Sequence, residues 1–454
     1  MSIYSPTRRT FIRQAACAAL GSAGLLNTIF DLRRLSAATV PSDDYKALVC
    51  LFLFGGNDAN NVIVPHDANG YAAYAAARGL LALPQASLLP ITLQNGDGRD
   101  FALHPSVPEM QALFNQGKLG IVTNVGTLVA PITRAQYLSG GAAVPSQLFS
   151  HADQSVQWQT SVPDQISRTG WGGRTGDALR GLNSGSQISL CISIAGTNTF
   201  EVGNIVLPYS VSSDGSLGLS GFDGSANANI RLQAFRDLLA QPQNNLLEQA
   251  YAGTTTRAIA ANDLLTSALA GISSLQTVFP NTSLANQLKM VAKLISARTN
   301  LSMRRQIFFC SVSGYDTHGD QLAGQANLLA ELSQALNAFY SATTELNVAD
   351  MVTTFTASDF GRTFPTNGSG SDHGWGSHQF VMGGAVRGGR LFGTFPTLAV
   401  NGPDDTGQGR WIPTTSVDEF SATLATWFGV SSSDLSTVLP NIGRFANPNL
   451  GFFV

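Results

Sequence analysis

The sequence predicts an α/β fold of three layers, α/β/α, with helices on both faces of a mainly parallel sheet. Continuous apolar runs of strand length alternate along the chain with longer segments of helical periodicity. Strands buried on both faces contain such continuous runs, because neither face meets water. With 44% hydrophobic and 12% charged residues, the 454-residue chain has enough apolar material for one large domain with insertions or for two domains.

The elements follow in chain order. Strands are predicted at residues 47–54, 119–125, 188–194, 307–312 and 351–357, and helices at residues 105–116 and 324–344. Residues 212–229 are dominated by Gly, Ser and Asn, which is typical of a loop. Helical patterns follow at residues 230–252 and from residue 257 into residues 284–301. These helices could form an insertion over the sheet, at about residues 212–302, or ordinary helices of the covering layers.

The N-terminal segment has the order of an export signal. Arg8 and Arg9 form a twin-arginine signature, an uncharged apolar run follows at residues 15–29, and small residues at 36–38 offer a cleavage site. An amphipathic helix that stays on the protein is the alternative. We predict a twin-arginine signal segment at residues 1–38 and one α/β domain at residues 39–454. The twin-arginine export machinery would carry the folded protein to the periplasm, or the protein would be secreted.

Charge and cysteine content exclude several classes of function. The formal net charge is -3 and no basic field is present, so nucleic acid is not expected as a partner. No apolar segment of spanning length follows the signal, so no stable membrane anchor is expected. Cys50, Cys191 and Cys310 each lie inside an apolar run and form no Cys-x-x-Cys pair. That pattern favours buried cysteines over a thiolate metal site, although the periplasm would permit a disulfide.

Four of the six histidines lie in short segments that also contain Asp or Ser. The densest segment contains Asp372, His373 and His378 within seven residues, and two others contain His151 and His318. Imidazole and carboxylate are ligands of Zn²⁺, Mn²⁺ and related ions, and a site assembled from distant segments leaves scattered clusters of this kind. The sequence therefore predicts a metal site. The two remaining histidines each stand beside a proline and are expected at the surface: His66 and His104.

Three aspartates come just after predicted strands: Asp58, Asp316 and Asp359. Ligands of open parallel sheets bind outside the carboxyl ends of the strands, so these carboxylates can converge. Each also has a plainer interpretation, as a turn residue for Asp58 and as a capping residue for the other two. Arg362, three residues after Asp359, could bind an anion through its guanidinium or could be solvated.

Ser150 precedes a helical pattern that begins at His151. A serine in that position is most often an N-cap. A hydroxyl at a helix N-terminus also lies where main-chain N–H groups stabilise an anionic substrate. A metal-free Ser-His-Asp hydrolase is a further possibility, but Gly-x-Ser-x-Gly is absent around Ser150. Adjacent Ser and His side chains also do not readily form a catalytic pair.

In their order along the chain, these motifs resemble those of an uncharacterised, twin-arginine-exported bacterial family called domain of unknown function 1501. The motifs lie at residues 55–61, 150–151, 315–318, 358–363, 372–374 and 383–389. The similarity extends from about residue 46 to residue 454. That family is similar to the alkaline-phosphatase-like superfamily, which includes phosphatases, sulfatases and metal-dependent mutases. The resemblance implies an alkaline-phosphatase-like (sulfatase-like) fold and a type of site, and it leaves the activity open.

The resemblance implies two divalent metal ions, of Zn, Mn, Mg or Ca, in a hydrolase. One ion would be held by Asp58 and Asp359, and the other by Asp316 with nearby histidines. The full set of expected metal ligands is Asp58, Asp316, His318, Asp359, Asp372, His373 and His378.

The resemblance also implies hydrolysis of a small anionic phosphate or sulfate ester. Ser150 would be the nucleophile, and His151 or Arg362 would steady the non-bridging oxygens. Two departures stand against this activity. Phe360 occupies the position of a superfamily histidine ligand, and His318 follows its aspartate at a shorter spacing than is usual. The alternative function is a non-catalytic, metal-stabilised binding or assembly protein on the same scaffold.

Overall fold

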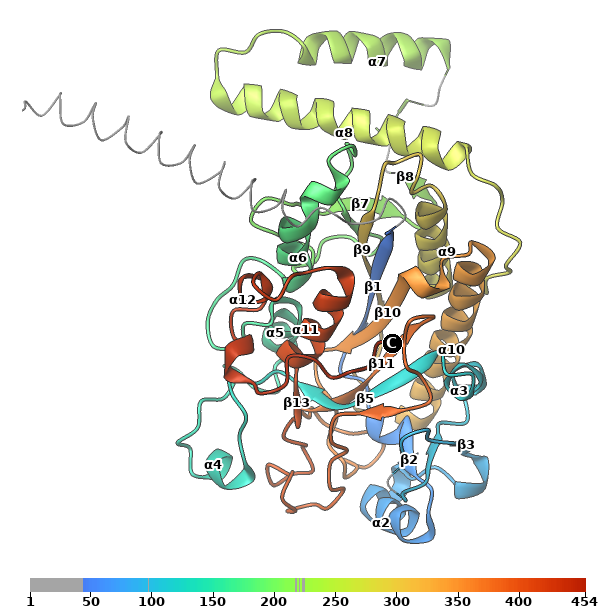
Figure 1. Cartoon of the computed structure of the whole chain (residues 1–454), viewed down its shortest axis with the longest axis vertical. Coiled ribbons are helices and arrows are strands. Elements are labelled where there is room, and N and C mark those ends of the chain that lie inside the picture. Colours follow the sequence, from blue (N-terminus) through green and yellow to red (C-terminus); the bar gives the residue numbers. More distant parts are fainter. Residues whose placement is uncertain (1–43, 97, 217–218, 220, 223–224) are drawn as a thin grey trace, which may run out of the picture. The chain divides into compact units, whose positions relative to one another are not determined.

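A ten-stranded sheet forms the centre of the computed structural model, which describes residues 44–96, 98–216, 219, 221–222 and 225–454 (Figure 1). Its strands, in spatial order, are β12 (Leu391–Phe392), β5 (Leu119–Gly126), β11 (Ser377–Gly383), β10 (Val352–Ser358), β1 (Lys46–Phe54), β9 (Arg305–Ser313), β6 (Cys191–Ser193), β7 (Tyr209–Ser212) and β8 (Gly215–Ser216), with β13 (Thr415–Ser416) paired to β5. Lys46–Val454 form one compact unit. The predicted signal segment at residues 1–38 lies outside the described residues.

The central strand β1 lies between β10 and β9 and runs parallel to both. Every residue of β1 except the two at its ends is buried, as expected for a strand covered on both faces. The pairs β6–β9 and β6–β7 are also parallel, whereas β10–β11 and β11–β5 are antiparallel. The predicted α/β fold with a mainly parallel sheet is confirmed.

Helices cover both faces of this sheet (Figure 1). One layer contains α3 (Pro108–Asn115), α9 (Ser283–Ser296) and α10 (Gln321–Glu345), and the other contains α5 (His151–Thr160), α6 (Trp171–Leu179), α11 (Val417–Phe428) and α12 (Leu435–Val438). Leu48, Cys50 and Phe52 of β1 join a core cluster with Phe420 of α11 and Trp171 of α6. They alternate along β1 because successive side chains of a strand point to opposite faces. Cys50, Cys191 and Cys310 are buried and free.

A second, three-stranded sheet of β2 (Ile63–Pro65), β4 (Phe101–Leu103) and β3 (Leu89–Ile91) lies beside α2 (Ala68–Arg78). His104 directly follows β4 and is only 2% exposed, so the expectation of a surface histidine is wrong. Its Nδ1 accepts a hydrogen bond from the N–H of Ser106 at 3.0 Å, and burial lowers the pKa of its ring to about 4.

The helical pattern expected at residues 230–252 is two helices, α7 (Ala226–Leu239) and α8 (Leu246–Ala270), which contact each other. Pro242 lies in the break, where it cannot donate a main-chain hydrogen bond to continue a helix. The Asn245 side chain then accepts from the N–H of Leu247 and caps α8. The short helix α4 (Arg134–Leu138) follows β5.

None of the helices within the described ranges combines the length and the apolar character that a membrane crossing needs.

Candidate metal centre

Three histidine rings and one carboxylate meet where the central parallel strands end. Nε2 of His373 lies 3.1 Å from Nε2 of His151 and 2.9 Å from Nε2 of His318. The Asp316 carboxylate lies against all three rings. Its Oδ1 is 3.0 Å from Nε2 of His318 and 3.4 Å from Nε2 of His373. Its Oδ2 is 3.5 Å from Nε2 of His151. We call these four residues the histidine cluster.

Segments that follow neighbouring strands deliver the cluster. Asp316 and His318 come directly after β9. His373 follows β10 and a loop, and an antiparallel bridge pairs its main chain with that of Arg362. His151 is the first residue of α5. The cluster therefore assembles only when the strands β9 and β10 lie beside the same strand, β1.

The Nδ1 atom of each ring faces an oxygen outside the cluster. The oxygens belong to the Asp359 carboxylate for His151 (2.6 Å), the Phe149 main chain for His373 (2.7 Å) and the Asp372 carboxylate for His318 (3.2 Å). A main-chain carbonyl only accepts hydrogen bonds, so Nδ1 of His373 carries a proton. A neutral ring protonated at Nδ1 has its lone pair at Nε2. Hydrogen-bonded oxygens orient metal-binding histidines in this way.

The cluster fits a divalent metal ion. His151, Asp316 and His373 each offer one ligand atom, and these atoms all lie within 4.8 Å of one another. Four-coordinate Zn²⁺, with bonds of about 2.0–2.1 Å, needs ligand atoms about 3.3 Å apart. The contacts of 2.9–3.5 Å in the cluster are close to that spacing. Facing lone pairs without a cation or a shared proton between them would repel, so the donor set itself favours a bound ion.

Asp359, predicted as a direct ligand, lies behind His151. It follows β10 and is only 3% exposed. Burial raises the pKa of its carboxyl, and the hydrogen bond from His151 partly offsets that rise. Its Oδ2 also accepts from the N–H of Gly55 at 3.1 Å, whereas Oδ1 has no hydrogen-bond partner in the described part of the chain. Asp359 therefore fixes the orientation of the His151 ring.

Arg362 holds Asp316 and does not face the open site. Its Nη1 donates to Oδ1 of Asp316 at 2.9 Å and to the carbonyl of Gly55 at 2.9 Å. Its Nε donates to the carbonyl of Ser371 at 3.0 Å, and its side chain is fully buried. Partial burial raises the pKa of Asp316, but the hydrogen bond and charge of Arg362 hold it below the usual value. The guanidinium that was expected to steady substrate oxygens thus contacts Asp316 and two main-chain carbonyls.

Asp58, the other predicted ligand from a strand end, lies apart from the cluster in an ion pair. Its Oδ2 accepts hydrogen bonds from Arg78 and Gln321, and its Oδ1 accepts from Nδ2 of Asn60 at 3.0 Å. The side chains of Asp58 and Arg78 are both fully buried. Arg78 ends α2, and nothing in its local sequence indicates a partner near residue 58. No hydrogen bond among the described residues joins Asp58 to Asp359, which the resemblance had placed on one ion with it.

His378 also lies outside the cluster. It belongs to β11, is buried, and accepts at Nδ1 a hydrogen bond of 3.0 Å from the N–H of Asn124. Its ring stacks on Phe395 with 4.8 Å between the ring centroids. Burial lowers the pKa of His378 to about 3, so the ring is neutral at physiological pH. Asp372, in contrast, contributes through its contact with His318.

Ser150 caps α5 beside the cluster. Its hydroxyl donates to Oδ2 of Asp153 at 2.6 Å and accepts from the Asp153 N–H at 3.5 Å. The neighbouring His151 reaches the cluster itself, although the sequence interpretation placed it outside the metal ligands.

Phe149, which sequence reasoning missed, has a φ of +72°, a conformation that L-residues seldom adopt. No local sequence signal marks it, because its role is a main-chain contact with His373.

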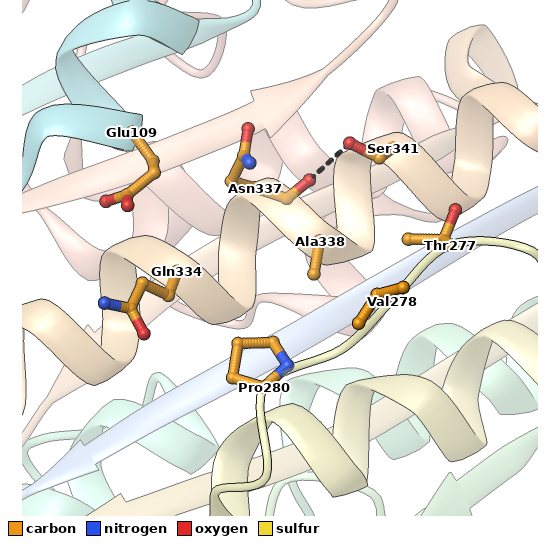
Figure 2. Close-up of a pocket in the computed structure, with 8 residues that line it drawn as sticks. All are labelled: Glu109, Thr277, Val278, Pro280, Gln334, Asn337, Ala338 and Ser341. Carbon is orange, nitrogen blue, oxygen red and sulfur yellow. Dashed lines mark hydrogen bonds between the residues drawn. The ribbon is translucent and has the colours of Figure 1, made fainter.

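A separate pocket of about 480 Å³ lies along α10, and none of the four residues of the histidine cluster lines it (Figure 2). It is lined by Glu109, Thr277, Val278, Pro280, Gln334, Asn337, Ala338 and Ser341. Glu109 is the one titratable residue in this lining, and it already accepts a hydrogen bond from Ser333 at 2.7 Å.

Comparisons with known proteins give a family and several distant structures. Residues 45–437 match the family model described as protein of unknown function (DUF1501). None of the curated proteins compared with the chain matches it. A sulfatase from Pseudoalteromonas sp. is 12% identical with a TM-score of 0.35, over 86% of this chain and 68% of that one. The lipoteichoic acid synthase of Listeria monocytogenes is 7% identical with a TM-score of 0.35, over 88% and 76%. The phosphonate monoester hydrolase of Agrobacterium radiobacter is 10% identical with a TM-score of 0.31, over 84% and 74%.

Proposed function

The chain belongs to the DUF1501 family of proteins of unknown function, and we propose that it is an exported, metal-dependent hydrolase of phosphate or sulfate esters. The histidine cluster carries this proposal. The Nε2 atoms of its rings point toward one another and toward Asp316, while each Nδ1 atom contacts an oxygen outside the cluster. A network of purely structural hydrogen bonds would instead pair each acceptor with a donor. Three Nε2 atoms gathered beside one carboxylate support a site for a cation.

A divalent ion held there would act as a Lewis acid on the ester and would acidify the attacking hydroxyl. The protein's own part is to keep the ligands in place. Asp359 fixes the His151 ring, and Arg362 fixes Asp316. The imidazole and carboxylate donors suit Zn²⁺ or Mn²⁺ better than Mg²⁺ or Ca²⁺, which prefer oxygen ligands.

The hydroxyl of Ser150 is the proposed nucleophile. It lies at the N-terminus of α5, where main-chain N–H groups favour an anion. Its oxygen would form the new bond to phosphorus or sulfur as the bond to the ester oxygen breaks, and the leaving group would depart as an alkoxide or phenolate that takes its proton from solvent. The serine proton would pass to Oδ2 of Asp153, which already accepts its hydrogen bond at 2.6 Å. Water would then attack the serine ester and lose a proton to solvent, the bond to the serine oxygen would break, and the proton held by Asp153 would return to that oxygen as the inorganic anion leaves.

The test is metal content and turnover measured on one preparation of the purified protein. We expect about one or two divalent ions per chain by mass spectrometry, with hydrolysis of 4-nitrophenyl phosphate or sulfate that a chelator abolishes and added metal restores. His373→Gln should lose both metal and turnover. His66→Gln, at a histidine outside the cluster, is the matched control and should keep both. Folded wild-type protein that holds no metal and hydrolyses neither ester would exclude the proposal.

A second candidate function is a metal-stabilised binding or assembly protein on the same scaffold. The observation that favours it is the cap geometry of Ser150, whose hydroxyl both donates a hydrogen bond to the Asp153 carboxylate and accepts one from the Asp153 N–H. In this case the metal-loaded protein hydrolyses neither ester, yet chelation lowers its Tm. That combination would support the second function and exclude the first.

Export by the twin-arginine pathway to the periplasm is part of the proposal. Its support is the pair Arg8 and Arg9 before an apolar run and a small-residue cleavage site. The double variant R8K/R9K should stay in the cytoplasm, while wild type reaches the periplasm, as measured by cell fractionation and immunodetection. The same segment offers a control in R33K/R34K, which changes a second arginine pair. Equal export of R8K/R9K and wild type would argue against this route.

A further inference from the structure

Arg410 contacts two residues at the histidine cluster, His373 and Phe149, which also contact each other. Nδ1 of His373 lies 2.7 Å from the carbonyl of Phe149, and Nε of Arg410 donates to the carbonyl of His373 at 2.7 Å. The guanidinium of Arg410 then lies over the Phe149 ring, with 4.1 Å from Cζ to the ring centroid. Cation–π contact and the hydrogen bond together fix the plane of this guanidinium beside a metal-binding ring.

The two arginines near the cluster differ in what their guanidinium groups contact. Arg362 donates to Asp316, Gly55 and Ser371 and is fully buried. Arg410 is half-buried, and of its guanidinium nitrogens only Nε donates a hydrogen bond within the described ranges of the chain. Its two terminal amino groups, Nη1 and Nη2, remain as donors. A guanidinium with both terminal groups open binds a tetrahedral oxyanion in a bidentate manner.

The acidic groups near Arg410 have other partners. Asp405 accepts hydrogen bonds from the N–H groups of Gln408 at 3.2 Å and Arg410 at 2.9 Å. Asp372 accepts from Nδ2 of Asn367 at 3.1 Å and contacts His318. Partial burial lowers the pKa of Arg410, while the charges of Asp372 and Asp405 oppose that shift. The guanidinium is thus a partly desolvated positive group that forms no ion pair with a carboxylate of the residues the structure describes.

The backbone of Phe149 supports a functional role for this arrangement. A φ of +72° is strained for an aromatic residue, and such strain persists where the surrounding structure requires one conformation. In that conformation the carbonyl of Phe149 meets His373 and its ring meets Arg410. One residue therefore places both a metal-binding ring and an arginine.

We infer that Arg410 binds the oxyanion of the substrate, a phosphate or sulfate group, beside the histidine cluster. This inference rests on the proposed function for its choice of substrate class, but it assigns the recognition of the anion to a residue that the sequence did not indicate. Arg362, which was expected in this role as an alternative to His151, contacts Asp316 instead.

The experiment is calorimetric titration of the zinc-loaded and the metal-free protein with inorganic phosphate and, separately, with sulfate at constant ionic strength. Arg410→Gln should weaken binding of the preferred anion by about 10- to 100-fold, because a charged hydrogen-bond pair is lost. The anion affinity of Arg410→Lys should lie between those of wild type and Arg410→Gln, since lysine keeps the charge without the bidentate guanidinium. Arg134→Gln is the control, because Arg134 is also half-buried and also donates Nε to a main-chain carbonyl, that of Asp405 at 2.8 Å.

The zinc affinity of each variant separates anion binding from positioning of His373. An unchanged zinc affinity with weaker phosphate or sulfate binding supports the inference. Equal anion binding by R410Q and wild type overturns it, as does a wild type that binds neither anion. A parallel loss of zinc from R410Q overturns it as well and makes Arg410 a positioning residue. Anion binding that depends on Arg410 in a protein without esterase activity would keep the inference and remove the proposed function.

Discussion

Nδ1 of His151 lies 2.6 Å from Oδ2 of Asp359, and the carboxylate is almost completely buried. The pair joins the first residue of α5 to the residue that follows β10. Because burial raises the pKa of Asp359, its negative charge is costly unless an N–H donor or a nearby cation stabilises it. A cation bound at the histidine cluster and this buried acid are therefore expected to stabilise each other.

The first prediction concerns Asp359→Asn. The amide removes the buried charge and keeps the size, so metal affinity should fall about 10- to 100-fold while the metal-free protein stays at least as stable as wild type. Competition with a chromophoric chelator measures the affinity, and thermal unfolding in chelator measures the stability. Asp372→Asn is the control, because Asp372 faces His318 from an exposed position and should matter less. Wild-type metal affinity in D359N would show that the pair is not part of the site.

The second prediction separates nucleophile from helix cap at Ser150. Ser150→Ala should abolish ester turnover with the metal content unchanged, and should cost about 1 kcal/mol of unfolding free energy. Ser225→Ala removes the equivalent cap of α7 and should cost a similar amount without loss of turnover. Denaturant unfolding and initial rates are the measurements. If S150A retains most of the wild-type rate, Ser150 is a cap and another group attacks.

The third prediction concerns Gly55, whose φ is +118°. A Cβ added there would lie 2.3 Å from the main-chain nitrogen of Asp316, so Gly55→Ala must displace the cluster. We expect loss of metal binding and a stability loss of about 2–4 kcal/mol from strain and overpacking. Gly98→Ala is the control, because Gly98 also has a positive φ, +93°, but has open space around its Cβ position. It should cost about 1 kcal/mol and keep the metal. Similar losses in both variants would mean that the close approach to Asp316 is unimportant.

The fourth prediction is a stability maximum at mildly acidic pH in the metal-free protein. Burial lowers the pKa of His104 to about 4 and that of His378 to about 3. Their contribution to the free energy of unfolding is therefore complete above about pH 6.5 and is lost as the pH falls toward those values. Burial raises the pKa of Glu201 to about 8 and that of Asp418 to about 7. Their contribution to the free energy of unfolding is therefore complete below about pH 4 and is lost as the pH rises toward those values. The opposing slopes place the maximum at about pH 4.5–6.5.

Thermal unfolding in chelator from pH 3 to 9 checks this fourth prediction. Glu201→Gln should flatten only the alkaline side of the profile of stability against pH, because it removes a group that ionises only at high pH in the folded state. His104→Asn should flatten the acidic side alone, with its side-chain oxygen in place of Nδ1 as acceptor for Ser106. If neither variant alters the profile, other groups determine the pH dependence.

Much of the fold could be predicted from the sequence because burial is encoded locally. The apolar runs of β1, β9 and β10 mark strands covered on both faces, and the structure places these three side by side. Their order then explains why Asp316 and Asp359 approach each other through His151. The break between α7 and α8 could have been found from Pro242 and Asn245, which are local signals.

Local patterns in the chain were enough to predict the layered α/β fold, the strand ends at which polar groups gather, and several of the residues that meet there, among them Asp316, His318 and His373. The partner of each group became apparent only from the folded arrangement. Asp58 is neutralised by Arg78, His378 turns into the core, and the carbonyl of Phe149 holds His373. Apolar periodicity indicates burial along one segment, whereas each of these contacts depends on how segments far apart in the sequence pack together. His151 and Asp359 are 208 residues apart and meet at 2.6 Å.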